Sequence, residues 1–351
     1  MNKLHLDAII LFMVISGKIP DWILNNKSKI KKIISQFRHR KILVVGDLML
    51  DQFIWGKVSR ISPEAPVPVV WVERESYMPG GACNVAHNIQ DLGSQTIVVG
   101  IIGEDSSGAI LLEELRKKNL DISGIIRVKH RPTTHKTRVI AHSQQVVRID
   151  REVVEPVSRK IVNKLLDLIS KRISEVDAVI VEDYGKGVVV SSLVRNIVEL
   201  GKKYRKIVSV DPKKEHFRYY KNITTITPNK VETESAVGIE IKDDRSLVKA
   251  GEKLLRKLSA KSVLITLGEN GMCLFQERKT PLHIPTMAKE VYDVSGAGDT
   301  VIASFTLALA SGASFPEAAY IANQAAGIVV GKIGTATVTK EELVREINRW
   351  R

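Results

Sequence analysis

From residue 41 onward, short apolar runs alternate with segments of helical apolar spacing, and this rhythm restricts the fold more than any other feature. Each run ends in a polar residue or glycine, as a buried strand does. The runs occupy residues 41–47, 96–103, 178–183, 206–212 and 262–271. The helical patterns occupy residues 80–93, 108–120, 158–173, 190–204, 244–258, 299–312 and 316–331. Strands that alternate with helices predict a three-layer α/β/α fold around a mainly parallel sheet.

Two segments with a period of two residues do not fit that sheet. Residues 53–75 alternate but contain Pro63, Pro66 and Pro68, which restricts them to edge strands. Residues 138–150 alternate again. We expect two segments, about 52–78 and 125–150, to form a small β flap, or lid, over the edge of the sheet. Exposed strand edges invite pairing with a second copy, so we also expect a homodimer through the flap.

Residues 1–40 form a basic segment ahead of the first predicted strand. Eight lysines and arginines stand against Asp7 and Asp21, so this segment carries +6 of the net charge of +14. Its apolar run at residues 8–17 is too short to span a bilayer, and we expect no membrane partner. We therefore divide the chain into an extension at 1–40, helical or disordered, and one domain at 41–351. We expect residues 1–38 to be dispensable for activity.

The basic composition leaves nucleic acid open as a partner. However, no basic motif interleaved with aromatic residues, as in nucleic-acid-binding modules, occurs in the sequence. Cys83 and Cys273 lie far apart without a CxxC pair, which argues against a disulfide scaffold or a zinc site and fits a reducing cytoplasm. The sequence favours a cytoplasmic protein that binds no nucleic acid, with a basic nucleic-acid-binding protein as the alternative from another class.

Acids and lysines follow most of the predicted strands. In open α/β sheets, ligands bind outside the carboxyl ends of the strands. At these ends the sequence has Asp47, Glu104-Asp105, Asp183-Tyr184-Gly185-Lys186, Asp211-Pro212-Lys213, Pro228-Asn229 and Thr266-Leu267-Gly268. This edge suits the chemistry of phosphates and divalent metal ions.

A glycine-rich turn, Gly296-Ala297-Gly298, leads directly into Asp299 and an apolar helical run. A helix N-terminus presents unpaired amides, and small residues let an anion approach them closely. Asp299 beside such a cradle can accept a proton from a hydroxyl, which suits attack of an alcohol on a phosphoryl group. The alternative is that Asp299 only caps its helix. The turn is not a Walker A loop, and no GxGxxG follows the first strand.

Two further motifs each have a catalytic and a structural interpretation. Asn229-Lys230-Val231-Glu232 places an amide and a carboxylate three residues apart, where they could hold a hydrated Mg²⁺ against triphosphate oxygens. The same spacing also forms a capping box. Gly80-Gly81 precedes a helix in which Asn84 could bond a sugar hydroxyl, and the alternative is a tight turn alone.

These motifs together resemble the ribokinase-like (PfkB) carbohydrate kinases. GGACNVAHNIQDLG and DVSGAGDTVIASF look like the two family signatures, and N-x-x-E and T-x-G-x-x-G lie between them. A finer resemblance is to the heptose 7-phosphate kinases of lipopolysaccharide-core synthesis, through SRISPEAPVPV, SQQVVRID, DYGKG, DPK, TPN and PLHIPT. That subgroup transfers the γ-phosphoryl of ATP to O1 of D-glycero-β-D-manno-heptose 7-phosphate. Another sugar, sugar phosphate or nucleoside kinase of this fold is the alternative. Many members carry a fused nucleotidyltransferase, and the resemblance implies that this second activity resides in another chain.

The resemblance implies a role for each matching residue. It makes Asp299 the catalytic base and Gly296, Ala297 and Gly298 the anion hole. It assigns the nucleotide phosphates and Mg²⁺ to Asn229, Lys230, Val231 and Glu232, and the rest of the nucleotide to Thr266, Gly268 and Asn323. It assigns the acceptor sugar to Asp47, Gly80, Gly81, Asn84, Asp183 and Lys186. A monovalent cation near Asp293 and Ser295 is also implied.

A phosphorylated acceptor needs basic donors for its second phosphate. The predicted flap supplies Arg127, Lys129, Arg131, Lys136, Arg138, Arg148 and Arg151, and we assign Arg138 to the substrate. A solvated basic strand is the alternative. Cys83 stands where the family has a small residue, and we expect it to be buried and inert.

Overall fold

The computed structural model of the chain describes residues 20–142, 144–288, 290–332, 334 and 336–350. A nine-stranded sheet with the order β13-β12-β11-β10-β9-β8-β1-β4-β5 runs through them. Its neighbouring strands pair parallel except at one end, where β12 pairs antiparallel with both β11 and β13. The strands are β1 (Lys41–Gly46), β4 (Gln95–Gly103), β5 (Asp121–Val128), β8 (Ala178–Glu182), β9 (Ile207–Asp211), β10 (Thr225–Ile226), β11 (Ser262–Thr266), β12 (Met272–Gln276) and β13 (Leu282–Ile284).

Helices cover both faces of this sheet, which explains why its strands read as continuous apolar runs. Successive residues of β1 point to opposite faces. Ile42 and Val44 enter the core beneath one helical layer, whereas Leu43 and Val45 enter the core beneath the other. The first layer contains α4 (Ala82–Asp91), α5 (Ser106–Lys117), α10 (Ala297–Ala310), α11 (Phe315–Val329) and α12 (Lys340–Asn348). The second contains α6 (Arg159–Arg172), α7 (Ser191–Tyr204), α8 (Lys230–Val237) and α9 (Asp244–Leu258). The predicted three-layer fold is confirmed.

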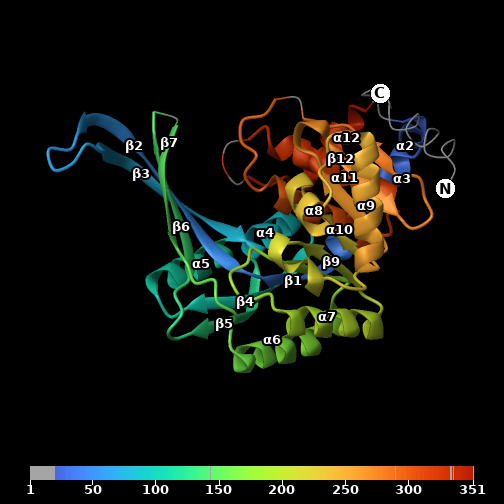
Figure 1. The fold of residues 1–351 in the computed structure, drawn as a ribbon, viewed down its shortest axis with the longest axis horizontal. Helices are drawn as coiled ribbons and strands as arrows, with labels where there is room; N and C mark the ends of the chain where they lie inside the picture. The colour runs from blue at the N-terminus through green and yellow to red at the C-terminus, as the bar shows by residue number, and fades with distance from the viewer. Residues whose placement is uncertain (1–19, 143, 289, 333, 335, 351) are drawn as a thin grey trace.

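A second, four-stranded sheet with the order β3-β2-β6-β7 forms the flap, which projects away from the body of the molecule (Figure 1). Its strands are β2 (Leu48–Ile61), β3 (Pro68–Gly81), β6 (Thr134–Ala141) and β7 (Gln144–Arg151). β2 begins just after β1, and β3 ends where α4 begins. The flap therefore leaves the main sheet at the carboxyl ends of its strands, next to the edge where ligands bind in such folds.

The predicted flap boundary at residue 125 differs from the structure. Residues 121–128 form β5, which pairs parallel with β4 in the main sheet, so the second flap segment begins at β6. β5 is the edge strand of the sheet, and all but one of its residues are partly or fully exposed, so it lacks the continuous apolar run that marks the buried strands.

Residues 20–39 are helical and packed, in contrast to the expectation of a dispensable extension. They form α2 (Asp21–Asn25), α3 (Lys27–Ser35) and the 3₁₀ turn η1 (Phe37–His39). Ile23, Ile30 and Phe37 are fully buried in the core of the first helical layer. Residues 1–19 lie outside the described part of the chain. Among the described helices, none combines the length and apolar character that a membrane span requires.

Candidate active site

The N-terminus of α10 lies at the carboxyl edge of the sheet, where it packs against α4 and the ends of β8 and β9. Gly296 caps the helix with φ +78°, a left-handed conformation that suits glycine. The Ala297 amide donates to Val294 O, which leaves the amides of Gly296 and Gly298 as the candidates for binding an anion at this turn. A Cβ at Gly298 would lie 3.9 Å from Asp211 Oδ2, so the turn faces the end of β9.

Asp299, in the first turn of α10, is buried, and each of its carboxylate oxygens accepts a hydrogen bond. Asn84 Nδ2 donates to Oδ2 across 2.6 Å, and the Tyr184 hydroxyl donates to Oδ1 across 2.9 Å. Burial raises the pKa of Asp299 to about 6, although these two hydrogen bonds lower it and Asp51 raises it. Asp299 is not the N-cap of α10, as the structural alternative had it, because Gly296 occupies the N-cap position. Asp299 is thus a buried acid whose pKa suits a base near neutral pH.

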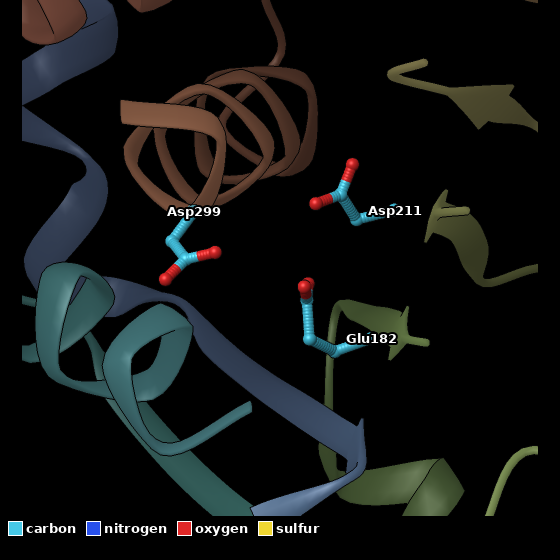
Figure 2. Close-up of side chains that lie close together, drawn as sticks. All are labelled: Glu182, Asp211 and Asp299. Atoms are coloured by element: carbon cyan, nitrogen blue, oxygen red, sulfur yellow. The ribbon is translucent and has the colours of Figure 1, made fainter. Parts of the chain in front are cut away.

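Two further carboxylates meet Asp299 at the ends of adjacent strands. Figure 2 shows the side chains of Glu182, from the end of β8, and Asp211, from the end of β9, pointing into the same space as Asp299. One ligand oxygen from each lies within 4.8 Å of the other two. Neither carboxylate oxygen of Glu182 has a hydrogen-bond donor among the described residues. Burial, followed by Asp211 and Asp299, raises the pKa of Glu182 well above its usual value. Buried, unpartnered oxygens of this kind fit a divalent cation, since Mg²⁺ prefers carboxylate oxygen.

A cavity of about 430 Å³ opens in front of Asp299. Its walls come from the flap, the N-terminus of α4, the loop after β8 and the N-terminus of α10. The lining residues include the predicted site residues Gly80, Gly81, Asn84, Arg138, Lys186, Gly296 and Asp299. The tertiary structure therefore brings together motifs that stand more than 200 residues apart in the chain.

The double glycine before α4 is required by the shape of this cavity. A Cβ at Gly80 would lie 2.2 Å from Asp51 Oδ2, and Gly81 has φ +56°. The turn therefore brings bare backbone against a carboxylate, as a tight turn that also lines a ligand cavity does. Asp51 in turn is paired with Arg138 across 2.5 Å.

Asp47 and Asp183 have their carboxylates outside the lining of this cavity. Asp47 accepts the backbone amides of Tyr184, Lys186 and Val188 at 3.0, 2.9 and 3.1 Å. Asp183 accepts from Tyr220, His216 and the Gly185 amide. These contacts make both residues supports for the loop after β8, instead of the sugar contacts that the resemblance implies.

The predicted nucleotide residues lie on the side of β8 away from the flap. They follow β10 and β11 or belong to the first helical layer. Asn229 and Glu232 form a capping box at α8, in which the Asn229 side chain accepts from the Glu232 amide and Glu232 accepts from the Asn229 amide. The capping alternative is therefore what these two side chains do here. Burial raises the pKa of Glu232. Lys230 and Val231 are exposed in the first turn of α8.

The other two predicted nucleotide positions also have defined places. Thr266 bridges to Asn229 at the end of β11, and Gly268 follows with φ +60° and open space where a Cβ would lie. Asn323, buried on α11, donates to Pro285 O across 2.7 Å, so its amide nitrogen holds the segment after β13.

Four residues of the site received no role from the sequence, namely Asp51, Glu182, Tyr184 and Asp211. Asp51 lies two residues after Met49 on β2, so both side chains are on the strand face that lines the cavity. Tyr184 and Asp211 stand at predicted strand ends, but nothing in the sequence indicates that they reach Asp299 or Glu182. Such contacts depend on the strand order β9-β8-β1, which local sequence does not reveal.

Three predicted features remain: the residues near Asp293, the thiol of Cys83 and the basic residues of the flap. Asp293 accepts the Ser295 and Gly334 amides, so its carboxylate ties two loops together beside the glycine-rich turn at 296–298. Cys83 is a buried free thiol whose pKa burial raises to about 12, as its expected inertness requires. Of the basic residues assigned to the flap, Lys136, Arg138 and Arg148 line the cavity. Arg131 instead donates to backbone carbonyls of Val153, Glu155 and Lys186.

Comparison with known proteins agrees with this geometry. The sequence model of the pfkB family of carbohydrate kinases matches residues 39–342. The bifunctional protein HldE of Geobacter sulfurreducens is 44% identical over 317 residues, which are 90% of this chain and 65% of that protein. The chain thus spans about two thirds of the length of this relative.

Solved structures share the fold at lower identity. The ribokinase of Arabidopsis thaliana, complexed with ribose and ATP, is 21% identical with a TM-score of 0.70, covering 88% of this chain and 98% of that one. Phosphofructokinase-2 from Escherichia coli, in complex with potassium, is 18% identical with a TM-score of 0.72, covering 89% and 99%. With a buried acid at a helix N-terminus, a cavity before it and a family match over most of its length, this chain belongs to the pfkB family of carbohydrate kinases and is a phosphotransferase that acts on an alcohol group of a sugar.

Proposed function

We propose that this enzyme uses ATP to phosphorylate O1 of D-glycero-β-D-manno-heptose 7-phosphate, which yields the 1,7-bisphosphate for ADP-heptose and lipopolysaccharide-core synthesis. The chain is 44% identical to a bifunctional HldE protein over 317 residues, which are 65% of that protein, and this similarity supports the substrate. The subgroup motif SRISPEAPVPV, which spans the end of β2, the turn and the start of β3, supports it too. Both cysteines are buried free thiols, which suits the cytoplasm, where we place the enzyme.

The observation that carries the proposal is the position of Asp299 between the cavity and the anion-binding turn. Asp299 takes the proton of the acceptor hydroxyl while that oxygen forms its bond to the γ-phosphorus of ATP. The bond from the γ-phosphorus to the bridging oxygen breaks, and the electron pair leaves with ADP. The amides of Gly296 and Gly298, at the positive end of α10, stabilise the charge on the transferring oxygens.

The residues that would hold Mg²⁺ are the carboxylates of Glu182 and Asp211, with Glu232 nearby. Glu182 has two buried oxygens without donors, and Asp211 and Glu182 are too close to remain charged together without a cation. Bound Mg²⁺ would supply charge neutralisation at the triphosphate. The Asn229 side chain belongs to its capping box, so we assign it to positioning α8. A monovalent cation beside Asp293 and Ser295 remains part of the proposal.

ATP consumption with a panel of sugars and sugar phosphates tests this function. We expect the highest kcat/KM with heptose 7-phosphate, and Asp299→Asn should lower kcat by ~10²–10⁴ while ATP still binds. Glu277→Gln, at an exposed position after β12, serves as a control. A preference for fructose 6-phosphate or a nucleoside would move the enzyme to the alternative within the family. Binding of DNA at physiological salt without ATP binding would instead favour the nucleic-acid alternative.

A further inference from the structure

Five charged side chains form a continuous chain of ion pairs along one wall of the active-site cavity. Arg148 pairs with Asp150 at 2.9 Å, and Lys136 bridges Asp150 and Glu152 at 3.0 Å each. Glu152 also pairs with Lys186 at 2.7 Å. All five residues line the same cavity as Asp299. We call this set, Arg148-Asp150-Lys136-Glu152-Lys186, the ion-pair chain.

The ion-pair chain carries more positive than negative charge in a sheltered place. Its three cations face two carboxylates, which leaves an excess of one positive charge. The side chains of Lys136 and Lys186 are only 12% and 16% exposed, so solvent screens them weakly. The neighbouring pair of Asp51 and Arg138 is neutral and does not offset the excess. A cavity wall of this kind attracts an anion.

The position of the ion-pair chain separates it from the phosphate that is transferred. Four of its members come from β6, β7 and the residue after β7, and Lys186 comes from the loop after β8. The proposed nucleotide residues follow β10 and β11, on the opposite side of β8 in the sheet order. An anion at the ion-pair chain therefore lies toward the flap, at the end of the cavity away from the nucleotide.

We propose that the ion-pair chain binds the phosphate of the acceptor, at the end of the sugar that does not react. This inference rests on the proposed function, since it assumes an acceptor with a phosphate group of its own. A phosphate monoester carries a charge of about −1.5 to −2 near neutral pH and offers three acceptor oxygens. The ammonium groups of Lys136 and Lys186 transfer hydrogen bonds from Glu152 to these oxygens, and the Arg148 guanidinium completes the site from the flap. A cavity of about 430 Å³ has room for a sugar phosphate.

The test compares each phosphorylated sugar with its dephosphorylated form. For Lys136→Gln and Lys186→Gln we expect the ratio of kcat/KM between heptose 7-phosphate and heptose to fall roughly 10- to 100-fold, with KM for ATP unchanged. Lys136→Arg keeps the charge and should retain most of the ratio. Lys57→Gln is the matched control, because Lys57 also lies in the flap but is exposed, pairs with Glu73 and does not line the cavity.

A binding measurement keeps the test independent of turnover. Heptose 7-phosphate should raise the melting temperature of the full-length wild type and of Lys57→Gln. It should raise the melting temperature of Lys186→Gln much less. An unchanged ratio in both folded glutamine variants overturns the proposal, while heptose 7-phosphate can still be the substrate. If the wild type instead prefers fructose 6-phosphate, the heptose assignment fails. In that case a lower ratio of kcat/KM between fructose 6-phosphate and fructose in the glutamine variants still supports phosphate binding by the ion-pair chain. A wild type that prefers unphosphorylated sugars overturns both.

Discussion

The hydroxyl of Tyr184 donates to Asp299 Oδ1 across 2.9 Å, from a loop whose backbone amides are held by the buried carboxylate of Asp47. Burial, followed by Asp299, raises the pKa of Tyr184 well above its usual value, so the phenol keeps its proton and remains the donor. With Asn84 on the other oxygen, this bond fixes the plane of the carboxylate that faces the acceptor.

Replacement of Tyr184 by Phe should therefore lower kcat roughly 10- to 100-fold, the usual range for loss of a hydrogen bond to a charged group. Because the bond favours the charged form of Asp299, its loss should also move the acidic limb of the kcat profile to higher pH. Tyr204→Phe, on the exposed side of α7, is the control. A kcat profile in Tyr184→Phe that coincides with that of the wild type would contradict the positioning role.

The pH dependence of the wild type follows from the raised pKa of Asp299. Below about pH 6 the carboxyl holds its proton and cannot accept another, so kcat should rise through this region and level off above it. The second ionisation of a sugar phosphate falls in the same range. Profiles measured with an unphosphorylated sugar separate the two groups, and a limb that disappears there would belong to the substrate instead of Asp299.

Metal dependence should respond to Glu182 as well as to Glu232. Glu182→Gln removes a buried carboxylate beside Asp211, and we expect the Mg²⁺ concentration at half-maximal activity to rise several-fold. In the absence of ATP, stabilisation of the fold by Mg²⁺ in thermal unfolding should shrink. Glu240→Gln, at an exposed acid that pairs with Lys242, should leave both titrations unchanged. Identical Mg²⁺ titrations in Glu182→Gln and the wild type would remove Glu182 from the metal site.

The N-terminal helices should contribute to stability. Ile30 of α3 is fully buried against the first helical layer, so Ile30→Ala should lower the free energy of unfolding by roughly 2–5 kcal/mol. Lys31→Ala, at the exposed neighbouring position, should have little effect. Denaturant titration of both variants checks this, and equal midpoints would restore the view that this segment is dispensable.

Homodimer formation through the flap should depend on its exposed apolar side chains. Trp71, 74% exposed on β3, and Ile61, 61% exposed on β2, are the largest of them. A dimer would bury these side chains, whose exposure is unusual for a monomer. Light scattering should give twice the mass of one chain for the wild type and a lower mass for Trp71→Glu, whereas a wild-type monomer would rule out this assembly.

The alternation of apolar runs with helical segments was sufficient to predict the layers of the fold. It works because a strand buried on both faces must be apolar throughout, and a covering helix must be apolar on one side. The sequence misplaced the β5 boundary because this edge strand is mostly exposed or half-exposed and lacks the continuous apolar run of a buried strand. The packing of residues 20–39 was not predicted, because a short amphipathic helix has little stability by itself. Only the neighbouring elements of the fold show that it is packed.

The candidate site also has one part that the sequence predicts and one part that only the tertiary structure shows. The sequence by itself determined that an acid follows a glycine turn at a helix N-terminus, since the turn and the helix start are local properties of residues 296–299. Only the tertiary structure decided that Asn84, Tyr184 and Asp299 meet, and that Asp47 faces the backbone of a loop. These contacts join segments that lie up to 215 residues apart, and they exist because the strand order places β8, β9 and α10 side by side.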